Sequence, residues 1–169
     1  NNLAQDYVNA YQHVFEIFEK YKVENIIWLW NPHLSYNFED YYPGDEYVDI
    51  ISFGILNFGT SLAWSKWWSF RELLSNSYDV LIKLNKPMMI SEFGSLNVGG
   101  DRSEWFKDAL AVIAMDYPAI NSIIFFHYSN ENSTDKDLDW YIIEDKKVTD
   151  EIILQMNKWP DSIKPPKQP

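Results

Sequence analysis

The pattern of apolar and polar positions predicts four buried β-strands that alternate with amphipathic helices. Apolar runs of strand length, bounded by proline, glycine or polar residues, are typical of buried strands. Apolar residues that recur every three or four positions indicate helices. The expected strands occupy residues 23–30, 47–53, 87–94 and 120–126, and the expected helices occupy residues 3–21, 69–84, 101–117 and 149–158.

Polar residues in capping positions support the helix assignments. Ser69 is followed three residues later by Glu72, and Asp101 by Glu104, which is the spacing of a capping box. A helix followed by four strand and helix units gives the order α(βα)4, which requires parallel pairing and right-handed crossovers. The predicted class is α/β, and four such units make half of an eight-stranded (β/α)8 barrel.

A polar residue stands at or just after the carboxyl end of each expected strand. These residues are Asn31, Asn57, Glu92 and His127. Barrel enzymes place their active sites at that end, so the four side chains are expected on one rim with Glu92 at its centre. Structural interpretations remain open: Asn31 precedes a proline and suits a turn, His127 suits a satisfied histidine, and Glu92 suits the start of a solvated loop.

Composition narrows the classes of partner. The 169 residues carry a formal net charge of −11, which argues against nucleic acid and anionic membranes because both attract clustered Lys and Arg. Aromatic residues make up 17% of the chain, so some rings are expected at a binding surface, and a neutral sugar is compatible with the charge. Cysteine is absent, which excludes disulfides and cysteine-ligated metals. We expect no cofactor, no metal and no membrane insertion.

Three motifs, in this order along the chain, resemble glycoside hydrolase family 26. They are Trp28-Leu29-Trp30-Asn31-Pro32, the turn segment from Tyr41 to Asp49, and Lys86-Pro87-Met88-Met89-Ile90-Ser91-Glu92-Phe93-Gly94. The resemblance covers residues 3 to about 158 and implies strands five to eight of a TIM barrel. It implies that Glu92 is the nucleophile of a retaining glycoside hydrolase that acts on a β-linked polysaccharide, with β-mannan as the favoured substrate. The family's acid/base glutamate, on strand four, would lie upstream of this chain.

The expected substrate contacts are aromatic and polar residues near the expected strand ends. A tryptophan face can stack on the CH groups of a sugar ring, while amide and imidazole groups can bond its hydroxyls. Trp140 also resembles a family position near the substrate. The set comprises Trp30, Asn31, Asn57, His127 and Trp140.

Leu56 departs from the family pattern. Hydrolases of the family tend to carry Asp-x-Tyr-Asn at the sixth strand, and the tyrosine contacts the nucleophile, whereas this chain has Gly54-Ile55-Leu56-Asn57. Leucine cannot donate a hydrogen bond, so a charged nucleophile would lose one donor that stabilises it. The stretch also looks like family 26-like modules joined to polysaccharide-synthesising glycosyltransferases.

Three functional hypotheses are compatible with these features. In the first, residues 1–160 are the C-terminal half of a hydrolase, completed by a missing N-terminal half, and residues 161–169 are a Pro-rich tail. In the second, the same scaffold is a non-catalytic carbohydrate-binding or polysaccharide-assembly module. In the third, two copies of the chain close one ring. The family resemblance implies an extracellular or cell-surface location.

Overall fold

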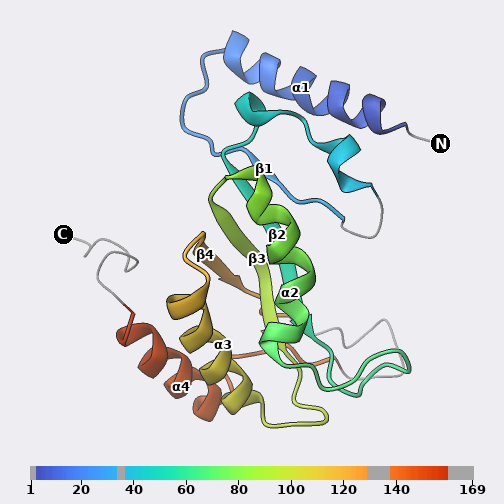
Figure 1. The fold of residues 1–169 in the computed structure, drawn as a ribbon. Coiled ribbons are helices and arrows are strands. Elements are labelled where there is room, and N and C mark those ends of the chain that lie inside the picture. The colour runs from blue at the N-terminus through green and yellow to red at the C-terminus, as the bar shows by residue number, and fades with distance from the viewer. Residues whose placement is uncertain (1–2, 34–36, 129–137, 160–169) are drawn as a thin grey trace.

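A four-stranded parallel sheet forms the centre of the protein (Figure 1). The computed structural model describes residues 3–33, 37–128 and 138–159. Strands that follow one another in sequence lie side by side, and every pair is parallel, which confirms the expected α/β class. The sheet order is β1 (Leu29–Trp30), β2 (Ile50–Asn57), β3 (Met88–Ser95) and β4 (Ile120–Phe125).

The helices begin where the sequence supplies caps. The Ser69 and Glu72 side chains bond each other's backbone N–H groups, and Asp101 accepts bonds from the Ser103 and Glu104 N–H groups. None of the helices within the described residues is long and apolar enough to cross a membrane. The α-helices are α1 (Ala4–Lys20), α2 (Phe70–Leu81), α3 (Arg102–Asp116) and α4 (Lys146–Asn157), and the short 3-10 helices are η1 (Phe38–Tyr41), η2 (Asp45–Tyr47) and η3 (Ile82–Leu84).

Three element boundaries differ from the expectation. The first strand was expected over 23–30 but comprises two residues, because the Asp49 carboxylate takes the Trp28 N–H that a longer ladder would need. The second strand was expected to end at residue 53 but continues to Asn57. The last helix begins at Lys146 rather than at 149, because Asp145 accepts the Val148 N–H and caps it.

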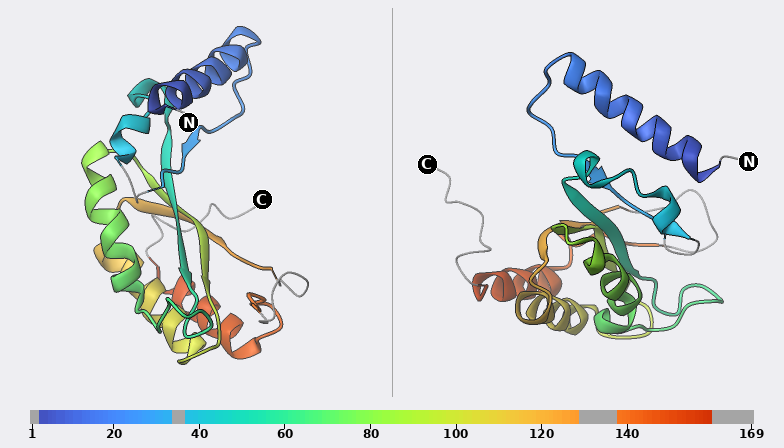
Figure 2. Two further views of the ribbon diagram at one scale, coloured as in Figure 1. Left: turned by 90° about the vertical axis from the view of Figure 1, so that its right-hand side faces the viewer. Right: turned by 45° about the horizontal axis from the view of Figure 1, so that its top comes forward.

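The sheet has one covered face. Figure 2 (left) shows α2 along one side of β2 and β3, and α3 and α4 toward the lower end of the view. Residues of β2 and β3 that point to this side, such as Ile51, Phe53, Ile90 and Phe93, are at most 3% exposed and form one cluster with residues of α2 and α3. The opposite side, here called the open face, carries Gly54 and the exposed Glu92. In a whole barrel this face would line the interior.

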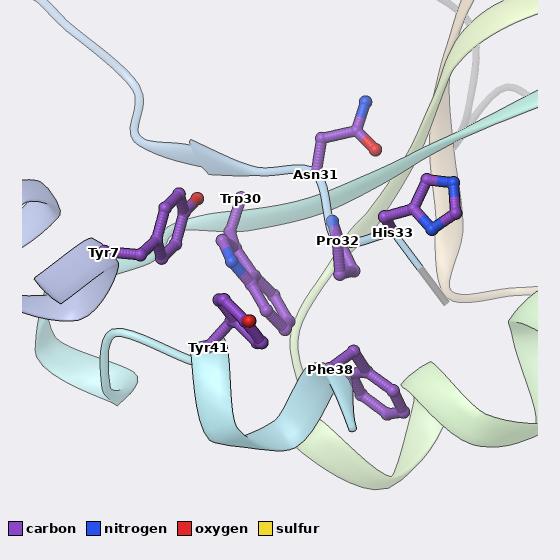
Figure 3. A pocket seen from close by; sticks show the side chains of 7 residues that line it. All are labelled: Tyr7, Trp30, Asn31, Pro32, His33, Phe38 and Tyr41. Atoms are coloured by element: carbon purple, nitrogen blue, oxygen red, sulfur yellow. The ribbon is translucent and has the colours of Figure 1, made fainter. Parts of the chain in front are cut away.

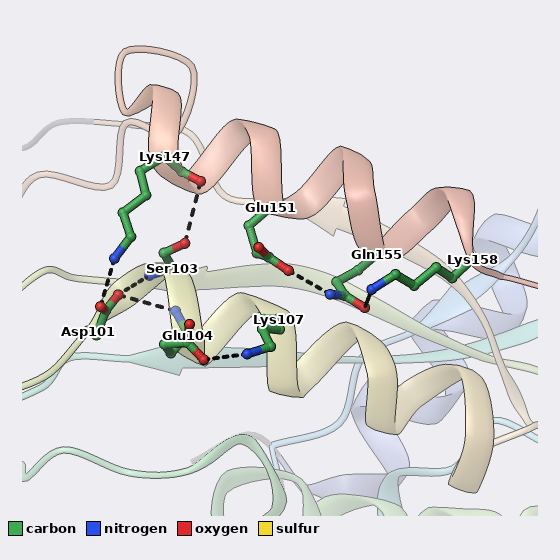
Figure 4. A network of polar contacts seen from close by, with 8 residues as sticks. All are labelled: Asp101, Ser103, Glu104, Lys107, Lys147, Glu151, Gln155 and Lys158. Carbon is green, nitrogen blue, oxygen red and sulfur yellow. Dashed lines mark hydrogen bonds and ion pairs between the residues drawn. The ribbon is translucent and has the colours of Figure 1, made fainter.

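Polar contacts fix α3 against α4 (Figure 4). Lys147 on α4 donates to Asp101 at 2.7 Å, and the Ser103 hydroxyl donates to the Lys147 carbonyl at 3.4 Å. The contact with Lys147, helped by the backbone N–H groups that Asp101 caps, lowers the pKa of the Asp101 carboxyl. These contacts hold together the two helices that follow β3 and β4.

We expect Asp101→Asn to remove the charge pair but keep the cap, since asparagine also accepts at an N-cap. Because the folded-state pKa of Asp101 is lowered, its contribution to stability is present above the unfolded pKa and is lost as pH falls through the folded one. Urea midpoints should favour the native sequence at pH 7, and the difference should begin to shrink at about pH 4 and vanish once the pH is below the lowered pKa of Asp101. A difference that persists in acid would assign the effect to something other than this charge.

Candidate active site

A β-bulge in β3 places Glu92 on the open face. Phe53 pairs with Ile90 and Gly54 with Glu92, so Ser91 is an extra residue in β3. Register against β4 also shifts between Ile90 and Phe93. In a regular strand Glu92 would share the covered face of Ile90, since side chains alternate. The bulge instead leaves Ile90 and Phe93 both buried in the core and Glu92 exposed between them. Bulges are frequent at barrel rims, where they re-aim functional side chains.

Gly54 makes room for the carboxylate. A Cβ at this position would lie 3.0 Å from Glu92 Oε2 and 3.6 Å from Glu92 Cβ. Gly54 is the residue paired with Glu92 across the ladder, so the acidic side chain extends over the backbone of β2. A glycine inside a strand commonly marks such a close approach. The carboxylate is thus placed by two features, the extra Ser91 in β3 and the missing side chain in β2.

We therefore expect Gly54→Ala to displace the Glu92 carboxylate. The new methyl group would be tighter against Oε2 than an ordinary contact, and the flexible glutamate can yield by a few tenths of an ångström or more. Folding should be nearly unchanged, because Gly54 is exposed and has an ordinary φ. Misplacing a catalytic group by about 1 Å costs on the order of 10²-fold. Thermal melts and kcat/KM of the longest natural polypeptide that carries this chain test this together, and a fully active alanine variant would show that the close approach is unimportant.

Asn31 belongs to the same face as Glu92. Its side-chain amide donates to the Ser91 hydroxyl at 3.2 Å, and thereby reaches from the end of β1 across β2 to the bulge. Asn31 is exposed and Ser91 is half-buried. Asn31 is thus hydrogen-bonded to the residue that precedes Glu92, and its role as a substrate contact stays a prediction.

Asn57 lies at the end of β2 but is fully buried and its amide is already used. Its Nδ2 donates to the Ser95 hydroxyl at 3.1 Å, and its Oδ1 accepts from the N–H groups of Gly59 and Trp68 at 3.1 and 3.3 Å. This arrangement ties β2 to β3 and closes the loop that precedes α2. The Asn57 amide is thus buried and used within the protein, which gives it a structural role here, and its contact with a substrate stays a prediction.

His127 points away from Glu92. It follows Phe125 by two residues, and both line an apolar pocket against α4 with Ile142 and Ile152, on the covered side of the sheet. Its Nδ1 accepts the Ile142 N–H at 3.1 Å, so a neutral His127 carries its proton on Nε2. The backbone of His127 lies at the end of the sheet where it was expected, just after β4, but its side chain does not lie on the open face. Alternation along β4 explains the difference.

The two tryptophans expected at the site are buried. Trp30 is 1% exposed and packs on Tyr42 at a ring distance of 4.9 Å, and Trp140 is 3% exposed. Figure 3 shows the Trp30 and Asn31 side chains leaving the chain in opposite directions, with Trp30 lying among the rings of α1 and η1. Trp30 is therefore a core residue. Trp140 covers Gly94, where an added Cβ would meet its ring at 3.2 Å, so it lies at the open face as a wall rather than as a free platform.

An aromatic pocket of about 240 Å³ lies between α1, η1 and the residues at the end of β1 (Figure 3). Burial raises the pKa of the Tyr7 phenol there, and its hydrogen bond with Trp30 offsets the effect only in part, so the hydroxyl stays neutral. The pocket is lined by Tyr7, Trp30, Asn31, Pro32, His33, Phe38 and Tyr41. Within the described residues no group of three or more His, Cys, Asp or Glu side chains is arranged to hold a metal ion.

Comparison with known proteins identifies the family. The profile of glycosyl hydrolase family 26 matches residues 2–110. Endoglucanase H of Acetivibrio thermocellus is 33% identical over 147 residues, which are 83% of this chain and 16% of that protein. Mannan endo-1,4-beta-mannosidase of Bacillus subtilis is 28% identical over 111 residues, which are 64% of this chain and 26% of that protein. The chain belongs to glycosyl hydrolase family 26, and it spans about a sixth to a quarter of the length of these relatives.

Solved structures show the same fold. The catalytic domain of the Bacillus sp. JAMB-750 GH26 endo-beta-1,4-mannanase has a TM-score of 0.60 at 18% identity, and the match covers 93% of this chain and 44% of that one. Bacillus subtilis mannanase BCman has a TM-score of 0.53 at 21% identity, with coverage of 76% and 35%. This chain therefore has the fold of part of a family 26 TIM barrel. The expected resemblance and fold are confirmed, while the roles of individual residues stay predictions.

Proposed function

We propose that the chain is the C-terminal half of a retaining glycoside hydrolase that acts on a β-linked polysaccharide, with Glu92 as nucleophile. The observation that carries this proposal is the position of the Glu92 carboxylate on the open face, re-aimed by the bulge and accommodated by Gly54. An exposed carboxylate beside Ser91 and Asn31 is in polar surroundings. The exposed position leaves this carboxylate accessible to a sugar ring that lies over the open face.

In this mechanism Glu92 attacks the anomeric carbon from the face opposite the leaving oxygen. A second carboxylic acid protonates that oxygen, and the same group later deprotonates the water that releases the sugar from Glu92. Retaining enzymes hold the two carboxyl groups ~5–5.5 Å apart. We assign the second carboxyl group to a chain segment outside these 169 residues, which would face Glu92 across the open face.

The similarity to a mannan endo-1,4-beta-mannosidase favours mannan as the substrate, and the similarity to an endoglucanase favours glucan. We place the protein outside the cell or at its surface, because long polysaccharides are degraded there. The polysaccharide and the segment that completes the barrel are the proposed partners.

The test is covalent trapping in the longest natural polypeptide that carries this chain. A 2-fluoro mannosyl or glucosyl donor with a good leaving group slows the second step, so the fluorosugar should stay attached to the nucleophile. Peptide mapping should find it on the peptide that contains Glu92. Wild-type protein that cleaves mannan or glucan but carries the label on another residue would overturn the assignment of Glu92.

A non-catalytic binding module on the same scaffold is the second candidate, and Leu56 favours it. Leu56 is half-buried beside Gly94, at 3.3 Å from the position of an added Cβ, and it has no hydrogen to donate toward Glu92. For this candidate the fluorosugar leaves no label, while oligosaccharides still bind. Leu56→Tyr then separates weak catalysis from none, because a restored donor should raise an existing activity and cannot create one without a second carboxyl group.

A further inference from the structure

An exposed tryptophan stands on a tightly closed loop at the same end of the sheet as Glu92. Residues 58–69 connect β2 to α2, and Trp64 within them is 71% exposed. The loop leaves the carboxyl end of β2, and both neighbours of β2 in the sheet, β1 and β3, belong to this chain. A missing strand beside β2 therefore does not explain the exposure of Trp64.

Hydrogen bonds fix the shape of this loop. The Asn57 amide oxygen accepts the N–H groups of both Gly59 and Trp68, which joins the two ends of the loop. The Ser65 hydroxyl donates to the Gly59 carbonyl at 2.7 Å, so the residue next to Trp64 is bound to the start of the loop. Thr60 donates its N–H to the Val98 carbonyl at 3.0 Å, which anchors the loop to the segment after β3.

Glycines allow the loop to lie directly on that segment. Gly59 has φ +54°, and a Cβ there would be 1.8 Å from the Val98 carbonyl oxygen. A Cβ at Gly100 would be 2.2 Å from the Trp67 ring, so this ring lies flat against the backbone. Because side chains are excluded at both contacts, the loop backbone that carries Trp64 lies directly on its neighbour.

A line of aromatic rings connects Trp64 to the strand that bears Glu92. Trp64 contacts Phe58 at a ring distance of 5.5 Å, and Phe58 meets Trp140 edge-on at 5.0 Å. Trp140 in turn covers Gly94, two residues beyond Glu92. The rings thus run from the open face of β3 outward to the exposed indole.

We propose that Trp64 is a stacking platform for a sugar unit of a β-linked glycan chain, beyond the unit that reacts at Glu92. This inference rests on the proposed function. An exposed, flat ring carried by a hydrogen-bonded loop fits the CH face of a pyranose. A protein partner would need a broad apolar patch, whereas the residues next to Trp64 in the loop sequence are Ala63, Ser65 and Lys66. Preorganisation of the loop lowers the entropic cost of binding a flexible glycan.

The experiment compares long and short ligands in the longest natural polypeptide. Trp64→Ala should lower kcat/KM for mannohexaose or cellohexaose about five- to tenfold, as expected for loss of one aromatic stacking contact. A short aryl glycoside that occupies only the reacting position should change less than twofold. Trp64→Phe should keep part of the effect. Tyr21→Ala is the matched control, because Tyr21 is 72% exposed on the turn after α1, and it should leave both substrates unchanged.

Binding measurements keep this test independent of catalysis. In a Glu92→Gln background, calorimetry with either hexasaccharide should show the same five- to tenfold weakening for Trp64→Ala. If no glycan is cleaved but this weakening occurs, the hydrolase proposal fails and the platform stands. Unchanged hexasaccharide affinity, an equal loss for the short aryl glycoside, an equal loss in Tyr21→Ala, or no hexasaccharide binding by the unsubstituted protein would each overturn the assignment of Trp64.

Discussion

Glu92→Ala in the longest natural polypeptide is expected to lower kcat on a β-glycan by roughly 10⁴-fold or more, the size of effect seen when a covalent nucleophile is removed. The loss should fall mainly on kcat, because the carboxylate forms its bond to the sugar after the glycan has bound. Thermal stability should change little, since Glu92 is exposed and within the described residues no hydrogen bond holds its carboxylate. Initial rates on mannan and mixed β-glucan check this expectation.

Azide provides a sharper version of the same experiment. In the alanine variant a small anion can occupy the space of the carboxylate and attack the anomeric carbon, giving an α-linked glycosyl azide from a β-linked substrate. Glu144→Ala is the control, because Glu144 is also exposed and lies in the segment before α4. It should retain activity within about twofold, as surface substitutions usually do. A Glu92→Ala variant with native activity would contradict the assignment of the nucleophile.

Much of the fold could be predicted from hydrophobic periodicity. Each of the four apolar runs overlaps a strand, and each of the amphipathic segments overlaps a helix. The Ser69 and Glu72 capping box is present as expected. These signals are local, so a single sequence carries them. The extent of β1 could not be predicted in this way, because the Asp49 side chain that replaces a ladder bond comes from another part of the chain.

The orientation of the site residues was harder to predict than their positions. Regular alternation would turn Glu92 toward the same side as Ile90, and only the extra Ser91 separates them. The residue types at positions 90 and 91, Ile and Ser, do not signal a bulge. Gly54 in an apolar strand, however, was a usable sign of close backbone approach. Asn57 ends β2 and His127 follows β4, but their side chains bond backbone groups of the segments beside them. The strand end determines the height of a residue on the barrel axis, while pleat and bulge determine the direction of its side chain.

The isolated 169 residues are expected not to form a stable monomer. The open face and the segment before β1 expose large apolar side chains, with Ile27 at 63%, Ile124 at 50% and Leu29 at 39% exposure. The ladder groups on the outer sides of β1 and β4 have no strand beside them within the described residues. At ~25 cal/mol per Å² of apolar surface, leaving a few hundred Å² in water loses several kcal/mol of hydrophobic stabilisation. This loss is comparable with the ~5–15 kcal/mol stability of a whole domain.

Sedimentation and thermal melts of the purified chain should therefore show self-association, or a broad transition with dye-accessible apolar surface. Addition of the segment that completes the barrel should give one complex with a cooperative melt, and a second copy of the chain is the alternative cover. Ile124→Asp should block either association, because it places a charge on the open face. Met115→Asp is the matched control, since Met115 is 81% exposed on α3 and lies outside the cluster of buried core residues. A monomer that melts cooperatively without any partner, and equally well as Ile124→Asp, would mean that the open face needs no cover.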